Sequence, residues 1–396
     1  MKFKTRIPSK IYINISLFYT LFVFAICYTI TSPVLIELAK DINCSVKNIG
    51  LIFSFYFCGF VLACLLSNWL INFFKRKILL SIFNFTLFAA IFSMSFASNF
   101  AYVVVVYFIL GISGGFLEPQ ISILIIDTNK KSEGLYVCLS QVFFCIGALV
   151  GPLISVVITK IGLDFKCAYI VAGVLCFINF IFFLFIDMST LENKKTEDLA
   201  NIRNMAKIKN RSIFVLLSAI MFFYVCAEIG LVTWIPLFLR LNKFFNRLLA
   251  GQVLSFFWFA TIVGRIFTGF LTKKIKILKI LVSMTCLSIV TIIVGIYSKN
   301  DTTTVISFIL AGFFIAGIWP LIVTEGGLKY PQNRNFAISI LVLSGGAGGL
   351  LAPIILSLIY RSFNLFIVMN TNYIFLILLI IPLTILFMIS KRFKVQ

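Results

Sequence analysis

Long apolar runs follow one another along the whole chain, with short polar segments between them. A run of about 18 or more apolar residues can cross the roughly 30 Å hydrocarbon core of a bilayer as an α-helix. Helices are expected because backbone groups in lipid must be hydrogen-bonded within their own segment. The pattern therefore predicts an all-α integral membrane protein with twelve transmembrane helices. The predicted spans are 11–36, 48–74, 78–97, 100–126, 135–160, 166–187, 212–239, 247–272, 276–298, 303–327, 334–360 and 364–390.

The second half of the chain repeats the first at an offset of 201 residues. LGISGGFLEP in the fourth span lies over AGFFIAGIWP in the tenth, so that Gly111 matches Gly312 and Pro119 matches Pro320. GALVGPLI and GGLLAPII match at the same offset. We expect two pseudo-symmetric six-helix bundles, residues 1–187 and 212–396, joined by a polar linker at 188–211. Parallel six-span repeats with a substrate site between the halves are the plan of a rocker-switch transporter.

Composition and charge support this organisation. The 396 residues are 61% hydrophobic and 12% charged, with a mean hydropathy of +1.10, whereas a soluble domain is nearer half apolar and a quarter charged. The net charge is +21. The termini and the even-to-odd loops hold 24 of the 34 Lys and Arg residues, and the opposite loops hold 9. Positive loops stay inside, so both termini and the linker are expected to be cytoplasmic, in the cell (inner or plasma) membrane. The charge is thus a topology signal, and no nucleic-acid partner is expected.

Other classes of function lack their signatures. The chain has no histidine and no G-x-x-x-x-G-K-[ST] motif, which argues against a His/Cys zinc site and against an ATP-driven pump. It also has no acid–base cluster on a long loop, so an enzyme is not expected. We expect no cofactor and no metal, and a monomer whose partners are a small solute, protons and lipid. Whether Cys44 and Cys167, near the outer face, pair as a disulfide is open.

Ionisable residues within spans are functional candidates because they are costly in hydrocarbon. Glu118 shares a helix face with Gly111, Gly114 and Gly115. Glycines admit a second helix closely, so this face should pack inside the bundle. Glu118 could carry a proton or could be a structural acid that holds spans together. In either case the following residue, Pro119, should strain the turn.

Four further charged residues are candidates. Glu228 follows Tyr224 by one helical turn, and Trp234 lies six residues on, so a carboxylate, a phenol and an indole could contact a sugar or could pack the bundle. Arg265, in the eighth span, could close a gate by pairing with Asp127 or Glu325, or could reach the headgroups. Asp127 and Glu325 lie at the cytoplasmic ends of their spans, where capping is the simpler interpretation.

Four stretches carry a resemblance to the major facilitator superfamily, and within it to the branch of the fucose permease and the glucose/mannose:proton symporter. They are GISGGFLEPQ, FYVCAEIGLVTWIPLFL, LSFFWFATIVGRIFTGFL and AGIWPLIVT, in this order along the chain. The chain departs from the pattern in two places. The loop after the second span lacks the acidic signature of the superfamily, and the first span has no acid before Glu37.

The resemblance implies roles for several residues. A glutamate at the place of Glu118 serves proton and sugar in that branch, and Gln141 stands where a sugar-contacting glutamine is found. Trp258 and Trp319 lie on spans that line the cavity of the family, although packing or interfacial use is the simpler reading of each tryptophan. The expected function is proton symport of a monosaccharide by alternating access. The alternative is a facilitator or exporter of drugs or other metabolites on the same fold.

Overall fold

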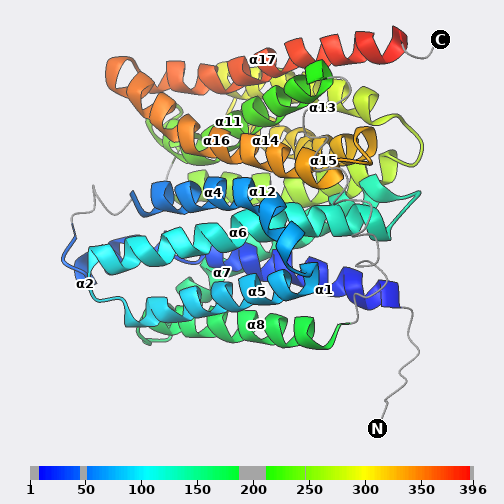
Figure 1. Cartoon of the computed structure of the whole chain (residues 1–396). Helices are drawn as coiled ribbons and strands as arrows, with labels where there is room; N and C mark the ends of the chain where they lie inside the picture. The colour runs from blue at the N-terminus through cyan, green and yellow to red at the C-terminus, as the bar shows by residue number, and fades with distance from the viewer. Residues whose placement is uncertain (1–8, 45–50, 187–210, 246, 393–396) are drawn as a thin grey trace. The chain divides into compact units, whose positions relative to one another are not determined.

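The computed structural model describes residues 9–44, 51–186, 211–245 and 247–392 (Figure 1). In this part of the chain twelve helices are long and apolar enough to cross a membrane, which confirms the twelve predicted spans. None of the described residues lies in a β-strand. The predicted linker at 188–211 lies outside the described residues except for its last residue, Arg211.

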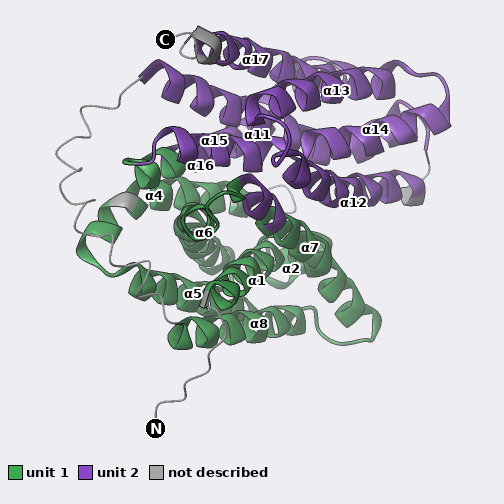
Figure 2. Ribbon diagram, turned by 90° about the vertical axis from the view of Figure 1, so that its right-hand side faces the viewer, with its two compact units in different colours: residues 1–133, 140–207, 332–339 green, residues 134–139, 208–331, 340–396 purple. Residues whose placement is uncertain are grey.

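The chain divides into two compact units (Figure 2). Unit 1 comprises residues 1–133, 140–207 and 332–339, and unit 2 comprises 134–139, 208–331 and 340–396. Two short stretches, residues 134–139 and 334–339, are therefore assigned to the opposite unit from the rest of their helices.

The described helices of the first half are α1 (Ser9–Thr29), η1 (Ser32–Val34), α2 (Leu35–Asp41), α4 (Leu51–Phe73), α5 (Arg76–Ser93), η2 (Met94–Phe96), α6 (Phe100–Thr128), α7 (Glu133–Lys160) and α8 (Lys166–Phe185). Those of the second half are α11 (Arg211–Leu241), α12 (Arg247–Leu271), α13 (Ile277–Tyr297), α14 (Asp301–Ile315), α15 (Ile318–Lys329), α16 (Arg334–Ser362) and α17 (Leu365–Arg392).

Glycines bring α4 and α6 into backbone contact. A Cβ on Gly111 would lie 1.9 Å from the carbonyl oxygen of Tyr56, and one on Gly115 would lie 2.1 Å from that of Phe60. The same contact recurs in unit 2, where a Cβ on Gly312 of α14 would lie 2.5 Å from the carbonyl oxygen of Phe257 on α12. The glycine face of α6 thus packs inside its unit, as the sequence predicted, because only glycine permits this approach.

Each unit also has a proline that releases one backbone carbonyl within a span. Pro119 has no N–H to donate to the carbonyl of Gly115, and the Cys64 thiol donates to that oxygen instead, at 3.2 Å. In unit 2, Pro320 likewise leaves the carbonyl of Ala316 without its helical donor, and Arg265 Nε donates to it at 3.3 Å.

The two prolines differ in their effect on the helix. α6 continues through Pro119, whereas the predicted span 303–327 is divided into α14 and α15 at Ala316 and Gly317. Gly317 packs against Thr268 of α12, where a Cβ would lie 2.4 Å from the threonine methyl group. The division therefore places the Ala316 carbonyl next to α12, within reach of Arg265.

Candidate functional site

A carboxylate, a phenol and a guanidinium meet in unit 2. Tyr224 and Glu228 lie one turn apart on α11, and Tyr224 Oη donates to Glu228 Oε1 at 2.7 Å. Arg265 Nη2, on α12, lies 3.8 Å from the same oxygen. The Glu228 side chain is 14% exposed and that of Arg265 only 4%. Charges this far from water must be compensated by partners, so these groups form one polar cluster, which we call the Glu228 cluster.

Arg265 is buried, and its guanidinium lies beside Glu228. The gate role that the sequence suggests for Arg265 stays a prediction. Glu325 pairs with Lys329 one turn along α15, at 3.2 Å. Arg265 contacts the Glu228 carboxylate on α11 and donates to the released Ala316 carbonyl.

Trp319 borders the Glu228 cluster. Its ring centroid lies 6.4 Å from that of Tyr224. Gly345 of α16 accommodates the indole, since a Cβ there would lie 2.6 Å from the ring. The indole Nε1 is buried and has no hydrogen-bond partner among the described residues. A buried indole N–H normally has a partner, so this group is suited to donate to a ligand.

The other two candidate tryptophans, Trp234 and Trp258, have aromatic neighbours of their own. Trp234 stands six residues beyond Glu228 on α11, about 9 Å along the helix axis, and its ring packs against Tyr360 with centroids 5.3 Å apart. Trp258 packs edge-on against its neighbour Phe257 and is half-buried. The Trp234 Nε1, like that of Trp319, is buried without a hydrogen-bond partner among the described residues. A role of Trp234 or Trp258 in substrate binding stays a prediction.

Glu118 lies in the interior of unit 1. It is 6% exposed and sits on α6, one turn beyond Gly114 and Gly115. The face it shares with these glycines is covered by α1 and α4, because a Cβ on Gly114 would meet the Phe24 ring at 2.3 Å and the Tyr56 hydroxyl at 3.1 Å. A buried carboxylate on a helix face covered by two other spans is a costly arrangement that structure or function must justify.

Two glutamines in unit 1 are also buried. Gln141, on α7, is 2% exposed. Gln120 of α6 is fully buried, and neither its Oε1 nor its Nε2 has a partner among the described residues. Gln120 was not among the candidates predicted from the sequence. A neutral amide beside a proline in an apolar run was the available signal.

Asp127 is the centre of a charged cluster in unit 1. Its Oδ1 accepts from Arg334 Nη1, and its Oδ2 lies 4.0 Å from Arg76 Nη1. Arg76 Nη2 also donates to Asn335 Oδ1 at 2.9 Å. Asp127 thus pairs with two arginines that are far from it in sequence.

Cys44 and Cys167 form no disulfide in this structure. Both are described, and each is a partly buried thiol. This resolves the pairing that the sequence left open.

Comparison with known proteins places the chain in a family. The family model described as Major Facilitator Superfamily matches residues 17–324 and 245–395. Among curated relatives, a "Protein TsgA homolog" of Buchnera aphidicola subsp. Schizaphis graminum is 26% identical over 367 residues, 92% of each chain. The "Glucose/mannose transporter GlcP" of Bacillus subtilis is 26% identical over 349 residues, 84% of this chain and 83% of that one.

A solved structure shares the fold. The outward conformation of the Major Facilitator Superfamily transporter FucP superimposes with a TM-score of 0.75 over 96% of this chain and 99% of that one, at 15% identity. Twelve spans, a repeat at an offset of 201 residues and a family match over almost the whole chain agree. The chain is an integral membrane transporter rather than an enzyme, and it belongs to the Major Facilitator Superfamily.

Proposed function

We propose that the protein is a secondary active transporter that moves a monosaccharide together with a proton across the cell membrane by alternating access. The Glu228 cluster is the observation that carries the proposal. A carboxylate held by a phenol and a guanidinium offers charge-assisted hydrogen bonds to sugar hydroxyls, and the flat ring of Trp319 beside it can stack on a sugar C–H face. The likeness to a glucose/mannose transporter supports this substrate class.

Glu118 is our candidate for the proton carrier. The chain has no histidine, so carboxylates are the groups that can bind and release a proton near neutral pH. Glu118 is 6% exposed and lies in the interior of unit 1. Glu228, in contrast, accepts from Tyr224 and lies 3.8 Å from Arg265. The two deep carboxylates therefore suit different roles, one for the proton and one for the solute.

The test of this function is uptake into proteoliposomes. A panel of aldohexoses, 6-deoxyhexoses and pentoses would be offered with and without an inward pH gradient. We expect one sugar class to be accumulated above its outside concentration only with the gradient. Equilibration without accumulation would indicate a facilitator, and proton-driven loss of solute from loaded vesicles would indicate an exporter.

Gln141 and Glu228 should both affect the affinity for that sugar. Replacing either by Ala leaves a sugar hydroxyl without its partner, which costs about 1–3 kcal/mol, or about ten- to a hundredfold in affinity. Trp258→Ala is the matched control, since the ring of Trp258 packs against Phe257. Equilibrium binding of the sugar to purified, monodisperse protein is the measurement. Wild-type affinity in Gln141→Ala and Glu228→Ala would assign these residues to packing.

Orientation is the second part of the proposal. The excess of basic residues in the termini and even-to-odd loops supports a cytoplasmic position of both termini. The pairs of Asp127 would then lie at the cytoplasmic end of α6. Because it joins three separate segments of the chain, Asp127 is our candidate for a cytoplasmic gate residue.

Cysteine labelling tests this orientation. Lys130→Cys, in the loop after α6, should resist an impermeant thiol reagent in intact cells, whereas Lys299→Cys, in the loop before α14, should react. Both native lysines are exposed, so a difference in labelling between the two positions would not be caused by burial within the protein. The background carries serine at the native cysteines that are not buried, Cys44, Cys58, Cys167 and Cys286. Labelling at position 130 and protection at 299 would reverse the orientation.

A further inference from the structure

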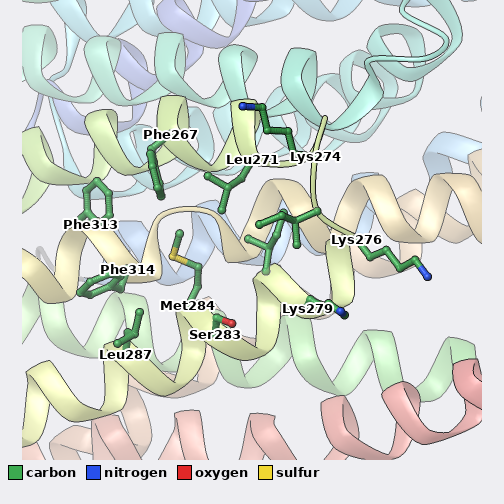
Figure 3. Close-up of a pocket in the computed structure, with 12 residues that line it drawn as sticks. Phe267, Leu271, Lys274, Lys276, Lys279, Ser283, Met284, Leu287, Phe313 and Phe314 are labelled. Atoms are coloured by element: carbon green, nitrogen blue, oxygen red, sulfur yellow. The ribbon is translucent and has the colours of Figure 1, made fainter.

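A groove on unit 2 is apolar at one end and basic at the other. It has a volume of about 770 Å³ and is bordered by α12, α13, α14 and the loop between α12 and α13. Figure 3 shows the rings of Phe267, Phe313 and Phe314 at one end and three lysine side chains at the other. The lining is thus divided between apolar and positively charged side chains. An anionic lipid is divided in the complementary way, into hydrocarbon and negative charge.

The length of the groove matches one leaflet. Lys279 is in the first turn of α13, and Leu287 lies eight residues farther along the same helix. At 1.5 Å per residue the two are about 12 Å apart along the axis, close to half of the roughly 30 Å hydrocarbon thickness. Met284 and Ser283 line the groove between them. An acyl chain could therefore lie along α13 with its polar end at the lysines.

The basic end has no acid near it in sequence. Lys274, Lys276 and Lys279 line it and are exposed, and the chain has no Asp or Glu between Glu228 and Asp301. Lys276 caps α13 and Lys279 follows in its first turn, where the helix dipole disfavours a cation. An anion at this place would offset both the dipole and the mutual repulsion of the lysines. Positive-inside topology alone requires basic loops, but it does not require an apolar groove that continues from them.

We propose that this groove binds an anionic phospholipid of the leaflet that the lysines face, with its phosphate at Lys274, Lys276 and Lys279 and an acyl chain along Met284 and Leu287. Basic pockets between membrane helices hold anionic headgroups by this chemistry. The site is separate from the Glu228 cluster, and the proposal does not depend on the solute that the protein carries.

The test compares phosphatidylglycerol with phosphatidylcholine of identical acyl chains. Each lipid is titrated into purified full-length protein in detergent, and bound lipid is measured by native mass spectrometry. We expect the wild type to prefer phosphatidylglycerol. The triple variant K274Q/K276Q/K279Q should lose affinity for it by about fivefold per lysine, or about a hundredfold in all, with little change for phosphatidylcholine.

Two further variants separate the proposal from simpler explanations. K10Q/K130Q/K131Q removes the same charge from exposed lysines outside the groove and should retain the preference. An equal loss in both triple variants would show diffuse surface attraction only and would overturn the proposal. Ser283→Trp fills the groove without changing charge and should weaken binding of phosphatidylglycerol about tenfold or more, since the acyl chain is displaced.

A competition experiment distinguishes the lipid from a soluble anion. Inorganic phosphate and glycerol phosphate share the headgroup chemistry but have no acyl chain. Displacement of phosphatidylglycerol by millimolar amounts of either, or unchanged binding in Ser283→Trp, would contradict a lipid site. Should the triple variant be produced poorly, the single variants K274Q, K276Q and K279Q give the same answer at about fivefold each.

Discussion

Arg265→Gln should destabilise the protein by about 3–5 kcal/mol, the usual cost of removing one partner of a buried ion pair. The substitution leaves the Glu228 carboxylate in unit 2 without the guanidinium that lies 3.8 Å from it. Glutamine retains an N–H that can reach the Ala316 carbonyl, so the break between α14 and α15 need not be disturbed. Thermal or denaturant unfolding of the purified protein in detergent is the measurement.

Two comparisons isolate the buried pair. Lys329→Gln breaks the Glu325–Lys329 pair of α15, in which the lysine is 25% exposed. This pair is more accessible to solvent and should cost less than about 1 kcal/mol. The double variant Glu228→Gln/Arg265→Gln removes both buried charges and should recover most of the stability while sugar binding stays lost. A stability loss in the double variant as large as in Arg265→Gln would show that the guanidinium acts through its Ala316 bond instead.

The spans and the repeat could be read from the sequence because lipid makes apolar length a strong signal. The offset of 201 residues extends to details of the structure. Asn99 and Asn300 both cap a helix, each accepting from the backbone N–H three residues on, at 2.9 and 3.1 Å. The donors to the two released carbonyls, Cys64 and Arg265, are themselves 201 residues apart. Duplicated halves would retain such a shared backbone arrangement while their side chains diverged.

The partners of the charged residues could not be read in the same way. Spacing places Tyr224 and Glu228 on one face of α11 because both lie on one helix. Whether Arg265 of α12 faces this side of α11 depends on how the two helices are rotated and shifted along their axes. Close helix contacts at glycines, such as that of Gly312 with Phe257, fix this rotation and shift locally. Asp127 illustrates the same limit, since Arg334 is distant in sequence and lies at the start of another span.

Glu118→Gln should abolish accumulation driven by a pH gradient while leaving exchange of the sugar intact. Glutamine has the shape of the protonated acid but cannot release a proton. One pH unit corresponds to about 1.4 kcal/mol and supports about tenfold accumulation at one proton per sugar. The variant should therefore fall from about tenfold to equal concentrations inside and outside, whereas counterflow in the same proteoliposomes should stay close to that of the wild type.

Glu37→Gln, which alters an exposed acid at the start of α2, is the matched control and should concentrate the sugar as the wild type does. Two results would count against Glu118 as the coupling residue. Accumulation by Glu118→Gln with an acidic exterior would show that the proton is carried by another group. Loss of both counterflow and accumulation would show that the carboxylate is needed for folding or for binding the sugar. A residue that serves coupling alone can stay in its protonated form without stopping exchange. Glu118 lies one turn beyond Gly114 and Gly115, which pack against Phe24 and Phe60. A structural defect at Glu118 would therefore also lower the unfolding temperature, which the coupling role does not predict.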